Sequence, residues 1–178
     1  MTKRLYEDLS VFFACSVSIE LEASERLREL AASMALHRDH ELSELFEKLA
    51  KNCELQGALA ENLSESLCIP NLRAWEHARP EGDFPKALDF AEIHHLMSAK
   101  DALETALSVE DKTERFYREI ASNAEDKKIK GYATQFAAEV LNQIEKVKEK
   151  MLGLNNCADS GPGLSNHLSD SNSQKLPD

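Results

Sequence analysis

Residues 41–67, ELSELFEKLAKNCELQGALAENLSESL, repeat an apolar or small side chain at every third or fourth position. This spacing follows the turn of an α-helix and predicts one buried stripe. The stripe consists of Leu45, Leu49, Cys53, Gln56, Ala60 and Leu63. A cysteine and a glutamine, one helical turn apart, therefore stand at the centre of the stripe, where a core usually places Leu or Val.

Three further segments show the same helical period. The first covers residues 5–36, the third begins near Ser98, and the fourth ends near Leu152. Ser98 can cap the third helix, with Asp101 answering three residues later, and Gly153 supplies a stop signal for the fourth. Short polar turns, HRDH at 37–40 and residues 123–126, connect the four helices into two hairpins.

The two hairpins are joined by one long crossover, about residues 69–97, which contains three prolines and a glycine. This pattern predicts an all-α, ferritin-like four-helix bundle over residues 1–153, with the third helix starting where the first turns into the second. Residues 154–178 are polar and of low complexity, so we expect a disordered tail that could contact a protein partner.

Charge and composition restrict the class of function. The formal net charge is −11 and no cluster of Lys and Arg is present, which argues against binding nucleic acid or an anionic membrane surface. No apolar run approaches the ~18 residues of a transmembrane helix. The four cysteines lack paired spacing. We therefore expect a cytoplasmic protein with reduced thiols.

The middles of the four predicted helices are occupied by Glu20, Cys53, Glu110 and Val140. Antiparallel packing brings helix midpoints to one height, so these residues should form one layer. Gln56 and Gln143 lie one turn further along their helices and should point inward as well. The prediction is a polar layer inside an apolar core.

At this point the sequence resembles the rubrerythrin-like members of the ferritin-like superfamily. The resemblance covers roughly residues 5–152 and rests on ELEASERLRELAASM at 20–34, on the second helix quoted above, and on IHHLMSAKDALETALSVEDKTERFYREIA at 93–121 with GYATQFAAEVLNQIEKV at 131–147. In the first and third helices, a Glu is followed by a small residue three positions on and by Leu or Tyr seven positions on.

The resemblance implies a diiron centre that reacts with peroxide or oxygen, held by one Glu from each of two helices and a Glu-x-x-His pair from each of the others. By position, Glu20 and Glu110 match the single glutamates. The paired motifs fall on Cys53 with Gln56 and on Val140 with Gln143, so four of six ligands are missing.

A register shifted by one residue would place Glu54 and Glu139 at the paired positions. It would recover two carboxylates but no histidine, and it would turn Leu49 and Phe136 away from the core, because one residue rotates a helix by about 100°. The unshifted register is therefore preferred.

Three interpretations of Glu20 and Glu110 follow. They form a neutralised hydrogen-bonded pair, or they bind a single divalent cation with the Gln56 and Gln143 oxygens, or a two-iron site is rebuilt through the shifted register. The space left by the missing metal ligands, which Cys53 helps to line, could also admit a small ligand.

A second cluster is suggested by His37, His40, His94 and His95, which the topology places at one end of the bundle. It could bind a metal or respond to pH, or it could consist of ordinary exposed histidines.

The sequence contains no replacement for the missing ligands and no other catalytic constellation. We therefore expect a degenerate bundle without a cofactor that serves as a binding or structural module, as a homodimer. The alternative is an iron-dependent oxidoreductase or iron-handling protein with an altered site at Glu20 and Glu110.

Overall fold

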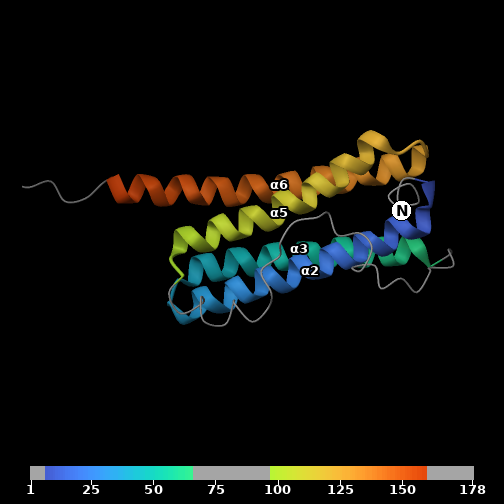
Figure 1. Ribbon diagram of the computed structural model, residues 1–178. Coiled ribbons are helices and arrows are strands. Elements are labelled where there is room, and N and C mark those ends of the chain that lie inside the picture. Colours follow the sequence, from blue (N-terminus) through green and yellow to red (C-terminus); the bar gives the residue numbers. More distant parts are fainter. Residues whose placement is uncertain (1–6, 66–96, 160–178) are drawn as a thin grey trace, which may run out of the picture.

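The computed structural model describes residues 7–65 and 97–159, and four long helices form almost all of this part of the chain (Figure 1). They are α2 (Leu9–Leu36), α3 (His40–Ser64), α5 (Ala99–Asn123) and α6 (Lys127–Asp159). These two ranges contain no strand. The predicted all-α four-helix class is therefore confirmed.

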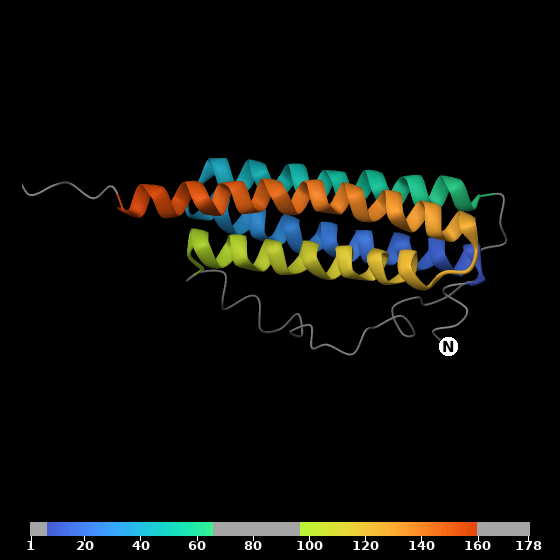
Figure 2. The same ribbon diagram turned by 90° about the horizontal axis from the view of Figure 1, so that it is seen from above.

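The helices form two antiparallel hairpins, α2 with α3 and α5 with α6, and α2 also packs against α5. Both views show the hairpins side by side, with α5 beginning at the end of the bundle where α2 turns into α3 (Figures 1 and 2). This is the arrangement predicted for two hairpins and one long crossover. Residues 66–96 of that crossover and residues 160–178 of the tail lie outside the described residues.

Side chains at the helix starts supply the hydrogen bonds that a helix cannot make for itself. The Asp8 carboxylate accepts from the amides of Ser10 and Val11, and the Asp39 carboxylate accepts from the amide of Leu42. α2 therefore begins at Leu9, and α3 begins at His40, one residue earlier than predicted. Residues 5 and 6 of the predicted first helix lie outside the described residues.

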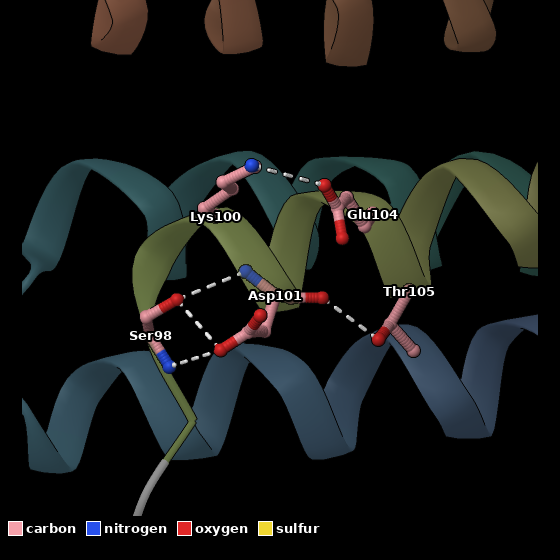
Figure 3. A network of polar contacts seen from close by, with 5 residues as sticks. All are labelled: Ser98, Lys100, Asp101, Glu104 and Thr105. Atoms are coloured by element: carbon pink, nitrogen blue, oxygen red, sulfur yellow. Dashed lines mark hydrogen bonds and ion pairs between the residues drawn. The ribbon is translucent and has the colours of Figure 1, made fainter.

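The start of α5 has the predicted capping box (Figure 3). The Ser98 hydroxyl accepts from the Asp101 amide at 3.1 Å, and the Asp101 carboxylate accepts from the Ser98 amide at 3.1 Å. The Ser98 hydroxyl also donates to the Asp101 carboxylate at 2.7 Å, and this bond, followed by that of the Ser98 amide, lowers the pKa of Asp101 below its usual range. A cap at this residue starts the second hairpin in the correct register after the crossover.

The predicted end of the fourth helix at Gly153 is wrong, because α6 continues through Asp159. A glycine ends a helix by adopting a positive φ, and no glycine of the described residues has one. The apolar face also continues beyond Gly153, since Leu154 packs against the core. This contact favours the extension of the helix over its termination.

Two clusters of buried apolar side chains form the core. The first contains Phe12, Phe13, Tyr117 and Phe136, towards the α5–α6 turn, and the second contains Leu27, Met34, Leu42, Phe46 and Leu103, towards the α2–α3 turn. Buried polar residues on α2 and α5 lie between them along the chain. Within the described residues, no helix has the length and hydropathy needed to cross a membrane.

Replacement of Ser98 by alanine tests the capping box. Ser98→Ala should lower the free energy of unfolding by about 1 kcal/mol, because the Asp101 amide loses its acceptor. Urea unfolding followed by circular dichroism measures the change. Ser122→Ala, in the exposed last turn of the same helix, is the control and should change stability by less than about 0.5 kcal/mol. Equal losses in the two variants would contradict a capping role.

Candidate functional site

The predicted middle layer lies in the interior of the bundle. Glu20, Cys53, Glu110 and Val140 have exposed fractions of 0%. Glu20 and Glu110 interact electrostatically with each other and with Cys53, so the three side chains from α2, α3 and α5 are neighbours. The helix midpoints therefore meet, as antiparallel packing requires.

The burial pattern supports the unshifted helix register, in which Cys53 with Gln56, and Val140 with Gln143, occupy the positions of the two Glu-x-x-His pairs. Gln56 and Gln143 have exposed fractions of only 7% and 3%. Glu139, by contrast, is exposed on α6. Glu54 is partly exposed and forms an ion pair with Arg28 at the surface between α3 and α2. A site built on Glu54 and Glu139 is therefore excluded by the way α3 and α6 are rotated.

One carboxylate oxygen of Glu20 accepts two strong hydrogen bonds. Gln56 Nε2 and the Tyr117 hydroxyl each donate to Glu20 Oε1, both at 2.7 Å. The Cys53 thiol also hydrogen-bonds to Glu20. Donors from α3 and α5 therefore converge on one side chain of α2 and link the two hairpins.

Aromatic packing holds the Tyr117 phenol in place. Its ring makes edge-to-face contacts with Phe116 and Phe136, with centroid separations of 5.1 and 5.3 Å, and with Phe12 at 6.4 Å. Such geometry is favourable for aromatic rings, and all three partners are buried. The first apolar cluster therefore fixes the hydroxyl that reaches the polar layer.

Four buried oxygen atoms in this region have no hydrogen-bond partner among the described residues: Glu20 Oε2, both carboxylate oxygens of Glu110, and Gln143 Oε1. Leaving a buried acceptor unpaired costs about 1–3 kcal/mol, and more when it is charged. In this layer Glu20 Oε1 thus has hydrogen-bond donors, whereas the two Glu110 oxygens have none within the described part of the chain. The unpaired atoms of the layer are all acceptors, which require protons, donors or a cation.

Burial raises the pKa of both carboxyl groups. The pKa of Glu20 rises to about 7, because desolvation outweighs its three hydrogen bonds. The pKa of Glu110 rises to about 8 through desolvation and the nearby charge of Glu20, while Lys146 partly opposes this. Without a bound cation the pair therefore holds protons near neutral pH.

The Cys53 thiol is an unsuitable redox group in this setting. Desolvation is the main cause that raises its pKa, and the charges of Glu110 and Glu20 raise it further. Cys15 is also a free, buried thiol, and burial raises its pKa to about 11. The carboxylates beside Cys53 therefore add to the effect of burial in suppressing its reactivity.

Two contributors to the layer were missed from the sequence. Tyr117 enters the sequence pattern only as the residue seven positions after Glu110, and its hydroxyl proves to be a donor to Glu20. Gly57 lets α3 approach α2 closely, since a Cβ there would lie 3.3 Å from the Glu20 Cβ. A buried Tyr in place of Phe, and a Gly inside a helix, are the signals that could have revealed them.

The residues present do not fit a two-iron centre. Val140 contributes no ligand atom, the two glutamines are neutral, and only two carboxylates would balance the charge of two irons. Among the described residues, no group of three or more His, Cys, Asp or Glu side chains is arranged to hold a metal ion. The unpaired oxygens of Glu110 and Gln143 are the type of ligand that a single hard cation takes.

The predicted histidine cluster is described only in part. His37 caps the C-terminus of α2 and His40 opens α3, and both are exposed at the turn between these helices. His94 and His95 lie outside the described residues. The pairing of these four histidines therefore stays a prediction.

The fold agrees with that of a solved protein. The chain is similar to a crystal structure described as an uncharacterized conserved protein from Magnetospirillum magnetotacticum MS-1, with a TM-score of 0.68 and 27% sequence identity. The likeness covers 80% of this chain and 92% of that one. No protein family model and no curated protein matches the sequence. The class defined by the fold is the ferritin-like four-helix bundle.

Stability should fall as the pH rises from about 5 to about 8. The folded pKa values of Glu20 and Glu110 exceed the ordinary value of 4.5, so the folded state binds protons more tightly than the unfolded state. This contribution is complete below pH 4.5 and is lost as the pH rises through about 7 and 8. At about 1.4 kcal/mol per pKa unit, the loss is on the order of a few kcal/mol.

Urea unfolding of chelator-treated protein at three pH values in this range measures the slope. Glu110→Gln should flatten the slope and be more stable than the wild type at the highest pH, because it removes a buried negative charge. Glu47→Gln, on the exposed face of α3, should retain the wild-type slope. An unchanged slope in Glu110→Gln would contradict the assignment.

The donor role of Tyr117 can be tested separately. Tyr117→Phe keeps the ring but removes the hydroxyl, so the free energy of unfolding should fall by about 1–3 kcal/mol. Tyr132→Phe is the control, since the Tyr132 ring also packs against an aromatic partner, Phe13, without contacting Glu20. A loss confined to Tyr117→Phe in urea unfolding supports the bond to Glu20, and equal losses argue against it.

Proposed function

We propose that this protein is a rubrerythrin-like, degenerate member of the ferritin-like superfamily, which has lost its diiron centre and acts as a non-catalytic binding or structural module. It works without a resident cofactor, in the cytoplasm, as a homodimer. The acidic composition, with no basic cluster, supports a role away from nucleic acids and anionic membranes.

The observation that carries this proposal is the hydrogen bonding of Glu20. Gln56 occupies the position where the resembling family places an iron-binding histidine, and here it donates to Glu20 Oε1 instead. A donor amide at this place competes with a metal for the same oxygen. Together with the Tyr117 hydroxyl, it occupies the lone pairs of Oε1 and leaves Oε2 as the Glu20 oxygen open to a metal.

The matching replacements on α6 support the same conclusion. Val140 is fully buried at the position of the paired glutamate, and it packs in the first apolar cluster. Gln143 stands at the position of the second histidine. Because both Glu-x-x-His pairs are replaced, neither iron would keep enough ligands.

A gain-of-function variant tests the proposal. The wild type, purified after iron supplementation, should contain much less than one iron per chain and show no oxo-bridge absorption. Combining Cys53→Glu, Gln56→His, Val140→Glu and Gln143→His restores the two motifs and should raise the content towards two irons. Metal analysis and an optical spectrum measure both quantities. Two irons per chain in the wild type would refute the proposal.

A second candidate function is an iron-dependent oxidoreductase or iron-handling protein with an altered, mononuclear site. The four unpaired buried oxygens of Glu20, Glu110 and Gln143 favour it, because a hard divalent cation takes carboxylate and carbonyl oxygens as ligands. Gln56 could join them after rotation of its amide, which exchanges its oxygen and nitrogen.

Calorimetric titration of metal-free protein with Fe²⁺ under anaerobic conditions, and with Mn²⁺, distinguishes the two candidates. The degenerate module should show no saturable binding, with Glu20→Ala giving the same result. A single site of one cation per chain that disappears in both Glu20→Ala and Glu110→Gln would establish the altered metal site instead. Glu47→Gln controls for loss of surface charge.

A further inference from the structure

A groove runs between α3 and α6, on the side of the bundle where these helices are separated. α2 packs along α3 and α5 packs along α6, whereas the backbones of α3 and α6 approach each other closely at few positions. An ion pair between Lys150 and Glu41 joins them near the start of α3. The cavity in the groove has a volume of about 700 Å³, within the usual size of small-molecule sites.

The groove reaches the polar layer through two amide side chains. Gln56 and Gln143 line it from α3 and α6, and both are more than nine-tenths buried. Gln56 donates to Glu20, but Gln143 Oε1 has no hydrogen-bond partner among the described residues. This oxygen is a buried acceptor behind the wall of the cavity, and rotation of the amide would present it to a donor on a bound molecule.

The groove has an acidic lining. Glu139, Glu145 and Glu149 line it over about three turns of α6, against the single lining cation Lys146, so these described residues carry a net charge of −2. No ion pair within the described residues involves any of the three carboxylates. Unpaired carboxylates along one face attract a cation and repel an anion.

Apolar side chains form the opposite wall. Leu55 and Leu59 line the groove from adjacent turns of α3, with exposed fractions of 60% and 41%, and the ring of Phe136 lies at its base. Large apolar side chains so exposed next to a cavity provide a surface for hydrocarbon. A ligand that fits must therefore be cationic and also carry an apolar stem.

We propose that the α3–α6 groove binds a small aliphatic amine, such as a diamine or polyamine. One ammonium group pairs with the carboxylate of Glu139, which lies one turn from Gln143, and donates to Gln143 Oε1 once that amide rotates. The second ammonium group pairs with a carboxylate further along α6, that of Glu145 or Glu149, and the methylene chain lies on Leu55 and Leu59. This combination uses the unpaired acceptor, the unpaired charges and the exposed leucines together. The site shares Gln143 with the alternative metal site but not Glu20 or Glu110, neither of which lines the groove.

Calorimetric titration of the chelator-treated protein with 1,4-diaminobutane and with spermidine tests the proposal, at low salt because salt screens surface charges. Both amines should bind with a stoichiometry of one per chain, and 1,4-butanediol, which is uncharged but similar in length, should not bind. Absence of saturable binding by both amines would overturn the proposal.

Matched variants locate the site. Glu139→Gln with Glu149→Gln should weaken amine binding by about tenfold or more, and Gln143→Leu should weaken it several-fold. Glu25→Gln with Glu47→Gln removes the same charge from exposed positions on α2 and α3 outside the groove and should leave the affinity within about twofold. Circular dichroism verifies that each variant is folded.

Two outcomes would contradict the assignment. Equal weakening in the groove variants and the control variants would mean that the amines bind only as general counterions. Binding of blocked lysine, Nα-acetyl-lysine N-methylamide, without binding of the free diamine would mean that the groove accepts a lysine side chain of a protein, and the proposal of a free amine would fail.

Discussion

The structure depends on how the bundle accommodates Glu20, a carboxyl group buried between two apolar clusters. Its Oε1 accepts from Gln56 on α3 and from Tyr117 on α5, so one side chain of α2 connects both hairpins. Gly57 makes this possible by removing the Cβ that would press on Glu20. The rings around Tyr117 then hold the donor in position.

Glu110 meets a different environment at the same height. Both of its oxygens are buried without a donor, and the charge of Glu20 adds to the cost of ionising it. The layer is therefore asymmetric, with hydrogen bonds around Glu20 and unsatisfied acceptors around Glu110 and Gln143. This asymmetry supports the proposed loss of the two-iron centre, and it is also the feature that leaves a single cation as the rival explanation.

The helical repeat of apolar residues in the sequence predicted the four helices that contribute to the buried polar layer. A buried stripe with the helical repeat can be read from local sequence, and capping residues such as Ser98 act within a single turn. The predicted helix end at Gly153 was wrong because it relied on local sequence alone. The glycine is a local signal for the end of a helix, but a tertiary contact outweighed it, because Leu154 packs against the core. The wider gap between α3 and α6 had no local signal at all, since it depends on how the two hairpins pack.

The sequence by itself determined the four helices, their pairing, and the meeting of Glu20, Cys53 and Glu110 inside the bundle, because these follow from spacing along the chain. Only the tertiary structure decided which donor meets which acceptor. The direction of the Tyr117 hydroxyl, the amide of Gln56 and the unpaired oxygens of Glu110 depend on the rotation and separation of helices from different hairpins. Those quantities arise from packing over the whole core, which no single stretch of sequence encodes.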